Sequence, residues 1–433
     1  MTSSPNHPSH ADTAPDLHVD EVHPRIALLV VRGRKDLPTE QIAVGEAVGR
    51  ILAADVLSPV SVPPHDNAAM DGYAFSGSAL QSAGADAELD LRVVGKARAG
   101  APWNGQLGPG EALRIMTGAV MPQGADTVVP QELCQPQADR VRFDRLRVVA
   151  GAHCRKAGED LRAGGLALAA GTRLTPAALG LLASLGQAEV NVRRRLRVAV
   201  LSTGDELLQP GEPPRPGAIY DSNRTTLSAL VRSLGLAPLD LGPVPDRADA
   251  LAAALADAGR QADVVISSGG VSVGEADHTR SALAASGELA FWHVAMRPGR
   301  PFAAGVLTGD AGAPLPFFGL PGNPVAAMVS FLVFVRPALL QLAGCGAAEA
   351  VAPLLVRART SRALRKRPGR TEYQRAVLRR VPGALPVVDV ALNQSSAVLS
   401  AMVAAEALVV LPHDQGHVDA GEEVDVLLLD TLF

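Results

Sequence analysis

The chain has 433 residues, of which 40 are Lys or Arg and 44 are Asp or Glu, so its formal net charge is −4. Because a single hydrophobic core stops growing at roughly 250 to 300 residues, this length predicts several domains. The nearly balanced charge argues against a protein that covers a nucleic acid with a basic surface. Three cysteines without CxxC spacing argue against a disulfide framework or a thiolate zinc site and favour a reducing compartment.

The first part of the chain has no basic cluster followed by an apolar run, as a targeting segment would have, and we expect no membrane span. We therefore expect a soluble cytoplasmic protein with neither a membrane nor a nucleic-acid partner. Residues 1–20 are rich in Pro, Ser, His and Asp, a composition that cannot form a core, and they predict a disordered tail.

The next segments combine few helices with many short apolar runs. Residues 21–60 have mixed apolar spacing, with one short helical pattern at 39–52. In residues 61–150, Gly and Pro interrupt the apolar runs, which predicts a β-rich module. Residues 151–195 are mostly loop, with one helix after Thr175-Pro176, where Pro suits the first helical turn.

Residues 196–345 alternate strand and helix patterns. The apolar runs 198–201 and 264–266 do not alternate with polar residues, as is typical of parallel strands buried on both faces. Between them we expect a helix capped by Ser222 or Asn223 and an Ala-rich helix at 247–258. The alternation predicts a doubly wound α/β domain.

Residues 346–433 contain short strand patterns separated by turns, which predict a small antiparallel barrel or sandwich. The basic stretch 357–380 has one interleaved aromatic residue, Tyr373. This stretch therefore favours a solvated face or a few phosphate contacts rather than stacking with nucleic-acid bases.

Two strands of the α/β segment end in Gly-rich turns that carry carboxylates, STGDEL and SSGGVSVGEAD. The carboxyl ends of neighbouring parallel strands are the ligand-binding edge of such a sheet. Backbone N–H groups at glycines suit a phosphate, and carboxylates such as Glu206 and Asp277 suit a hard cation. Taken one at a time, an ordinary turn or a helix cap explains each motif, and capping alone explains Asp246.

A third turn, GLPGNPV, places Pro321 and Pro324 around the start of an apolar helix. It suits either the presentation of N–H groups or a purely structural turn. His293, Arg297 and Arg300 form a cationic segment whose arginines can bind an oxyanion such as phosphate or molybdate, or simply face solvent.

In order along the chain, the motifs DNAAMDGYA, IMTGA, GED, STGDEL, ISSGGVSVGEAD, FWHVAMRPGRPF and GLPGNPV resemble the molybdopterin molybdenumtransferase family, which includes MoeA and the E domain of gephyrin. The similarity runs from about residue 25 to the end. It implies an elongated subunit of four domains: an elongated N-terminal domain (21–60 and 151–195), an inserted β-rich domain (61–150), a MogA-like α/β domain (196–345) and a C-terminal β-barrel (346–433).

The resemblance also implies a homodimer whose cleft joins the α/β domain of one chain to the second domain of the other. The implied substrates are adenylylated molybdopterin and molybdate, the implied cofactor is Mg²⁺, and a molybdopterin adenylyltransferase is a candidate partner. By motif, the implied catalytic residues are Asp71, Thr117, Asp160, Glu206, Asp246 and Asp277, the last three of them as metal ligands. The implied substrate-binding residues are Ser268, Gly269, Gly270, Gly274, His293, Arg297, Pro321, Asn323, Pro324, Arg375 and Ser396.

The chain departs from the family pattern at three positions. His293 and Arg297 stand where lysines are expected, and Ala68 stands where a serine is expected. Arg297 keeps its charge, whereas a histidine with an ordinary pKa of about 6.5 is mostly neutral at pH 7.

Two other functions remain open at the level of sequence. A molybdopterin adenylyltransferase would share the α/β domain but lack the surrounding domains. A non-catalytic scaffold of the same fold need not keep the acidic set that includes Asp71, Glu206, Asp246 and Asp277.

Overall fold

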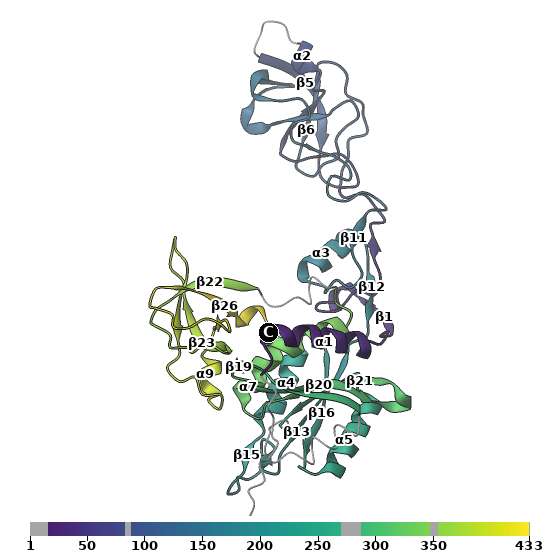
Figure 1. Ribbon diagram of the computed structural model, residues 1–433. Coiled ribbons are helices and arrows are strands. Elements are labelled where there is room, and N and C mark those ends of the chain that lie inside the picture. Colours follow the sequence, from purple (N-terminus) through teal and green to yellow (C-terminus); the bar gives the residue numbers. More distant parts are fainter. Residues whose placement is uncertain (1–15, 83–87, 270–286, 347–353, 433) are drawn as a thin grey trace, which may run out of the picture.

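The computed structural model describes residues 16–82, 88–269, 287–346 and 354–432. Figure 1 shows an elongated molecule, with a β-rich module at one end, a slender connecting module in the middle, and an α/β domain beside a small barrel at the other end. The chain crosses the connecting module twice, so the β-rich module is an insertion.

Helix α1 (Val19–Gly33) begins within the segment that composition assigns to the tail. His18 forms a capping box with Glu21, whose carboxylate accepts a hydrogen bond from the His18 backbone N–H at 2.8 Å. Val19, Val22, Ile26 and Val30 recur at helical spacing and are buried against the α/β domain. Burial of this apolar stripe explains why a short stretch after a polar tail is ordered.

The connecting module pairs strands that lie far apart in the sequence. β1 (Thr39–Ala43) pairs antiparallel with β12 (Glu189–Arg193), and β2 (Val56–Leu57) pairs with β11 (Leu166–Leu168). The helix expected at 39–52 was wrong, because β1 and the 3₁₀ turn Val44–Glu46 occupy that segment. Long-range pairing with β12 overrides the weak local pattern. Helix α3 (Pro176–Ser184) begins as expected, with Thr175 as its cap.

The inserted module is a six-stranded sheet in the order β7-β4-β6-β5-β9-β8, which confirms the predicted β-rich region. The chain enters and leaves this module through two segments, which pair with each other as β3 (Asn67–Ala68) and β10 (Cys154–Arg155). Helix α2 (Ala79–Ser82) follows the first strand of the sheet, β4. The strands of the sheet are β4 (Gly72–Phe75), β5 (Glu88–Ala97), β6 (Glu111–Ile115), β7 (Thr127–Pro130), β8 (Cys134–Gln137) and β9 (Arg140–Asp144).

The α/β domain is built on a six-stranded sheet in the order β16-β13-β17-β21-β20-β18. The first four strands of this order are parallel to one another, and β20 pairs antiparallel with both β21 and β18. The strands are β13 (Arg197–Thr203), β16 (Ala237–Val244), β17 (Val264–Ser268), β18 (Gly287–His293), β20 (Pro301–Thr308) and β21 (Pro314–Leu320), and a small pair, β14 (Leu207–Leu208) with β15 (Ile219–Tyr220), extends from the edge of the domain.

Helices cover both faces of this sheet. Val198 and Val200 of β13 pack in the core that includes α1, α4 (Ser222–Ser233) and the long helix after β21. Ala199 and Leu201 pack in the core under α5 (Ala248–Gln261). All four side chains are fully buried, which explains why this strand is apolar at consecutive positions and confirms the doubly wound fold.

The long helix after β21 runs through α7 (Pro324–Ser330), a π-helical segment (Phe331–Val335) and α8 (Arg336–Leu342). By length and hydropathy this helix is the one candidate membrane span in the described part of the chain, but 83% of it is buried inside the protein. It is therefore a core helix of the α/β domain, and its apolar residues pack in the same core as α1.

The C-terminal strands close into a barrel, which decides between the predicted barrel and sandwich. The ring runs β23-β24-β22-β26-β25 and returns to β23. One pair, β22 with β24, is parallel, so the barrel is not purely antiparallel. Its strands are β22 (Leu355–Thr360), β23 (Thr371–Arg379), β24 (Val387–Val390), β25 (Ala407–Leu411) and β26 (Glu423–Leu428), with helix α9 (Ser400–Val403) between β24 and β25.

The barrel is continuous with the α/β domain. β19 (Met296–Arg297) leaves the α/β domain and pairs in parallel with β23. Tyr373, Leu408 and Leu427 of the barrel belong to the same buried core as α1 and the central sheet. This shared core holds the barrel beside the α/β domain, and these two domains form the walls of the cleft described below.

Candidate active site

The strand ends that the sequence singled out meet at one edge of the sheet. β13, β17 and β21 are neighbours and parallel, so their carboxyl ends lie side by side. The Gly269 N–H donates to the Leu320 carbonyl at 3.1 Å. The side-chain amide of Asn223 donates to Ser268 Oγ and to the Gly322 carbonyl, both at 2.7 Å. These bonds fix the Ser-Ser-Gly turn against the Pro-Gly-Asn-Pro turn.

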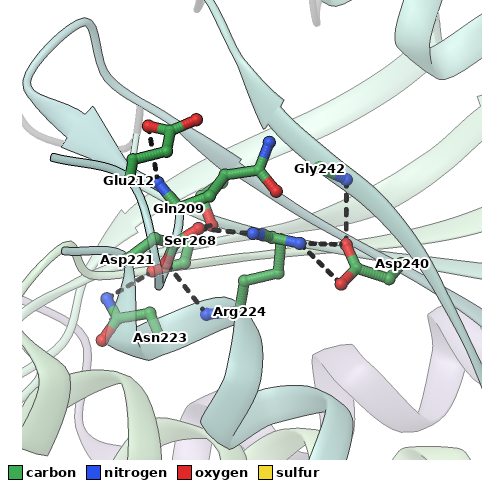
Figure 2. A network of polar contacts seen from close by, with 9 residues as sticks. Gln209, Glu212, Asp221, Asn223, Arg224, Asp240, Gly242 and Ser268 are labelled. Carbon is green, nitrogen blue, oxygen red and sulfur yellow. Dashed lines mark hydrogen bonds and ion pairs between the residues drawn. The ribbon is translucent and has the colours of Figure 1, made fainter.

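A network of polar side chains lies next to this edge of the sheet (Figure 2). Asp221 accepts hydrogen bonds from Ser202 Oγ at 2.7 Å and from Arg224 Nε at 2.9 Å, and Arg224 also contacts Asp240. Burial by itself lowers the pKa of Arg224, but its hydrogen bonds to Asp240 and Asp221 outweigh that effect and raise the pKa. Arg224 is thus a permanent cation that holds the start of α4 against β13 and β16.

The expected cap of α4 was wrong. Asp221, rather than Ser222 or Asn223, caps the helix by accepting a hydrogen bond from the Arg224 N–H at 3.1 Å. This shift leaves the Asn223 side chain available to bridge the β17 and β21 ends. Its bridging role depends on tertiary neighbours, so no local sequence signal distinguishes it from a capping residue.

A cleft of about 1230 Å³ opens between this edge and the barrel. Glu206, Arg297, Pro321 and Asn323 line it from the α/β side, and Ser396 lines it from the barrel side. Five of the residues implied by the family resemblance therefore share one cavity. The other lining residues that bear on its chemistry are Asp16, Gly299, Arg300, Gly322, Arg367, Gly369, Arg370, Gln394 and Ser395.

Several arginines give the cleft a cationic character. Arg300 donates to Asp16 through Nε at 2.8 Å and through Nη2 at 2.9 Å. This hydrogen bond is the main reason that the pKa of Asp16 lies below its ordinary value. Arg370 donates to Glu372 at 2.9 Å. Within the described residues, the Arg297 guanidinium has no hydrogen-bond or ion-pair partner and is exposed.

Exposed carboxylates stand at the ends of β13 and β16. Glu206 lies in the cleft, and Asp205 Oδ1 accepts a hydrogen bond from the Asp246 N–H at 3.2 Å, which places Asp246 beside the β13 turn. The interpretation of Asp246 as a helix cap was wrong, because Arg247 is the N-cap residue of α5 and no side chain caps that end. Asp246 therefore has a position that capping does not explain.

This donor set fits Mg²⁺, which typically takes one or two carboxylates, several waters and substrate phosphate oxygens. Glu206 and Asp246 would supply the carboxylates from neighbouring strand ends. Among the described residues there is no cluster of three or more His, Cys, Asp or Glu side chains that could enclose a metal ion by themselves. A divalent cation here would depend on the substrate for part of its coordination.

Two of the implied residues, Ser396 of the cleft and Arg375, lie in the barrel. Arg375 is 1% exposed, and its Nη2 donates to the carbonyls of Asn393 and Ser395 at 2.9 and 3.1 Å. The Ser396 carbonyl accepts from the Val325 N–H at 3.1 Å, at the start of α7. In this structure Arg375 thus holds the loop that carries Ser396, and the loop docks on the Pro-Gly-Asn-Pro turn.

The remaining implied residues of this domain that the structure describes do not line the cleft. Ser268 is the last residue of β17, Gly269 follows it, and Pro324 is the first residue of α7. His293 ends β18, with its Nδ1 4.0 Å from Asp16 Oδ1. Gly270, Gly274 and Asp277 lie outside the described residues.

Three implied catalytic residues lie elsewhere, in or next to the inserted module. Asp71 Oδ1 accepts hydrogen bonds from the N–H and the hydroxyl of Thr117 at 2.8 and 2.7 Å. The backbone bond is the largest cause of the lowered pKa of Asp71, followed by the hydroxyl. Asp160 is exposed on a turn whose backbone pairs with Val62. In Figure 1 this module is at the opposite end of the molecule from the α/β domain.

Sequence reasoning did not single out Asp16 or Arg367 as site residues. Asp16 lies in a segment whose composition indicates a tail, and only the pairing of Leu17 with Val294 brings it to the cleft. Arg367 lies in the basic stretch for which a few phosphate contacts were one of the predictions. Its position beside a Pro-Gly turn was the only available signal.

Comparison with known proteins agrees with this architecture. Residues 199–341 match a family model described as a probable molybdopterin binding domain, which is the class that the α/β fold and its cleft define. Residues 17–186 match the MoeA N-terminal region (domains I and II), and residues 357–429 match the MoeA C-terminal region (domain IV). The chain therefore belongs to the MoeA family of molybdopterin molybdenumtransferases.

The similarity to individual relatives extends over most of the chain. A molybdopterin molybdenumtransferase of Haemophilus influenzae is 42% identical over 390 residues, which are 90% of this chain and 93% of that protein. The corresponding protein of Nostoc sp. is 38% identical and covers 90% of this chain and 89% of its own length. A crystal structure of a molybdopterin biosynthesis MoeA protein from Pyrococcus horikoshii OT3 is 28% identical, has a TM-score of 0.77, and covers 95% of this chain and 99% of that chain.

Proposed function

We propose that this protein transfers molybdenum from molybdate to adenylylated molybdopterin and releases AMP. The observation that carries the proposal is the cleft, which is lined by Glu206, the Pro-Gly-Asn-Pro turn and the two arginines Arg297 and Arg367. The named activity of relatives that match nearly the whole chain supports it. The presence of all three MoeA regions favours this function over that of a molybdopterin adenylyltransferase.

In the proposed reaction, water attacks one phosphorus atom of the phosphoanhydride. The bond between that phosphorus and the bridging oxygen breaks, and AMP leaves. The two dithiolene sulfurs of molybdopterin then form bonds to molybdenum, and one oxygen of molybdate leaves as water with the two thiol protons. Arg297 would hold the phosphoryl or molybdate oxygens, because its planar fork matches an oxyanion. Asn323 and the N–H groups of its turn would orient the same oxygens.

The carboxylates Glu206 and Asp246 would hold Mg²⁺ beside the phosphoanhydride. When bound, Mg²⁺ neutralises the charge that develops on the phosphoryl oxygens. Asp277, the third metal ligand implied by the resemblance, is proposed on the motif alone. Ser396 would contact the substrate from the barrel wall, on the loop that Arg375 holds.

We further infer that the active protein is a homodimer. Asp71 and Thr117 lie in the inserted module, far along the molecule from the cleft of the same chain (Figure 1). If these residues and Asp160 act in the reaction, a second copy must bring them to the cleft. A cytoplasmic location and association with the adenylyltransferase that makes the substrate are consistent with this function.

The direct test is to incubate the purified protein with adenylylated molybdopterin, molybdate and Mg²⁺. We expect AMP release and a product that activates a cofactor-free molybdenum enzyme. Release of neither AMP nor active cofactor would refute the proposal and leave the scaffold hypothesis. Consumption of ATP with metal-free molybdopterin would instead support the adenylyltransferase.

A further inference from the structure

The cleft contains an arginine on the barrel wall to which the family motifs assign no role. Arg367 precedes β23, lines the cleft together with Arg297, and is exposed. In the described part of the chain, neither guanidinium has a hydrogen-bond or ion-pair partner. The cleft therefore presents two arginine charges from two different structural elements, β19 and the loop before β23.

The other cations of the cleft are already compensated. Arg300 is paired with Asp16, and Arg370 is paired with Glu372. These pairs leave Arg297 and Arg367 as the lining arginines whose charge is not matched by a described carboxylate. Glu206 supplies a single opposing charge at the strand ends, so the arginines leave the cavity with a surplus of positive charge that attracts anions.

The backbone at Arg367 is held in place, which distinguishes it from an ordinary solvated surface residue. The preceding residue, Lys366, is 7% exposed, and its ammonium donates to the carbonyls of Gln415 at 2.7 Å, His413 at 3.2 Å and Arg367 at 3.4 Å. This clamp ties the loop to the segment that follows β25, the strand next to β23. A pinned backbone reduces the ordering that the Arg367 side chain must undergo when it binds a ligand.

We propose that Arg367 is an additional substrate-binding residue, which with Arg297 clamps an oxyanion in the cleft. The oxyanion is a phosphoryl group of the nucleotide-linked substrate or the molybdate, since both present the geometry that a guanidinium recognises. The inference rests on the proposed function for the identity of these anions. The presence of both arginines in the lining of one cleft does not depend on it.

The test measures anion binding rather than turnover. Isothermal titration calorimetry would follow sodium molybdate and sodium pyrophosphate, in separate titrations, with the full-length wild type and the Arg367→Ala and Arg365→Ala variants. Arg365 is a matched control, because it is exposed, lies two residues away and does not line the cleft. Circular dichroism melting would verify that all three proteins are equally folded.

We expect Arg367→Ala to weaken the binding of at least one anion about tenfold, in the range of a lost charge-assisted hydrogen bond, and Arg365→Ala to leave both unchanged. Loss for pyrophosphate alone identifies a phosphoryl ligand, loss for molybdate alone identifies molybdate, and loss for both indicates a shared site. Unchanged binding in Arg367→Ala, equal weakening in Arg365→Ala, or no binding to the wild type would overturn the inference. If the wild type binds these anions through Arg367 but releases no AMP, the proposed function fails and this site stands.

Discussion

Glu206 illustrates a residue whose importance is chemical rather than structural. It is exposed at the end of β13 and lines the cleft, while the buried support of the same strand end comes from Ser202 and Asp221. Removal of its charge therefore changes the site without opening the core. Residues of this kind separate activity from stability in mutagenesis.

We predict that Glu206→Gln lowers the rate of AMP release by about 100-fold or more, because a positioned charge acts on the developing transition state. The unfolding free energy should change by less than about 0.5 kcal/mol, as for a surface substitution. Steady-state assays and urea denaturation measure the two effects. Glu212→Gln, a nearby exposed carboxylate outside the cleft, is the control. A parallel loss of stability and activity would contradict the prediction.

Asp263 is the opposite case, a buried carboxylate with a structural role. It is 6% exposed and is contacted by Arg194 Nη1 at 2.9 Å and Arg197 Nη2 at 3.2 Å. Burial raises the pKa of Asp263, but the hydrogen bonds from Arg194 and Arg197 lower the pKa by a larger amount. The net shift is therefore downward from the ordinary value of 3.8. The pair joins the segment before β13 to the start of β17.

We predict that Asp263→Asn destabilises the protein by about 3 kcal/mol at neutral pH, because it leaves buried donors without their anion. Since the folded pKa is depressed, the stabilisation is complete above about pH 4 and is lost as the pH falls through the folded pKa. The difference between wild type and variant should be constant from about pH 5 to 8 and shrink below about pH 4. Urea unfolding across this range measures it, with the exposed Asp257→Asn as control. A difference that grows on acidification would disprove the assignment.

At the scale of elements, the site depends on how closely three strand ends approach one another. Gly269 has a φ of +88°, and a Cβ atom there would lie 2.7 Å from the Thr203 carbonyl oxygen. A side chain at this position would push the β17 turn away from β13. The glycine is therefore required by packing between strands as well as by its backbone conformation.

We predict that Gly269→Ala costs about 1 to 3 kcal/mol of stability and abolishes most of the activity, because it displaces the end of β17 from the neighbouring ends of β13 and β21. Gly211→Ala is a matched control, since its φ is +98° but no atom lies within 4 Å of the added Cβ. Thermal melting and AMP release would be compared for both variants. Equal effects in the two variants would show that backbone strain alone, and not the approach to Thr203, is responsible.

The secondary structure of this edge was largely predictable, whereas its supporting contacts were not. Consecutive apolar residues identified β13 and β17 as strands buried on both faces, and Pro324 marked the start of α7. The assignment at 39–52 failed because β1 is stabilised by β12, about 150 residues away, rather than by its own sequence. The cap of α4 was misplaced by one or two residues because several neighbouring residue types favour that position.

At the scale of the whole molecule, the implied catalytic residues fall into two groups. Glu206 and Asp246 belong to the α/β domain. Asp71 and Thr117 form a hydrogen-bonded pair in the inserted module, at the other end of the elongated molecule. The elongated connecting module keeps these groups apart within one subunit. A site that uses both groups has to be shared between two subunits.

We predict that Asp71→Asn and Glu206→Gln variants, each nearly inactive alone, recover activity when they are unfolded together and refolded. In a dimer with two shared sites, each mixed dimer has one site that carries both substitutions and one that is intact. Random pairing makes half of the dimers mixed, so about one quarter of the wild-type activity should return. The control is each variant refolded alone. No recovery, despite mixed dimers detected by a tag on one variant, would place all catalytic residues within a single chain.

The sequence by itself determined the doubly wound sheet, the β-rich inserted and C-terminal regions and the family, because apolar periodicity and turn motifs are local signals. The tertiary structure alone decided which polar residues meet, such as Asp16 with Arg300 and Asn223 with Ser268. These contacts join segments separated by tens to hundreds of residues. Their side chains are polar, so hydrophobic patterning contains no record of their partners.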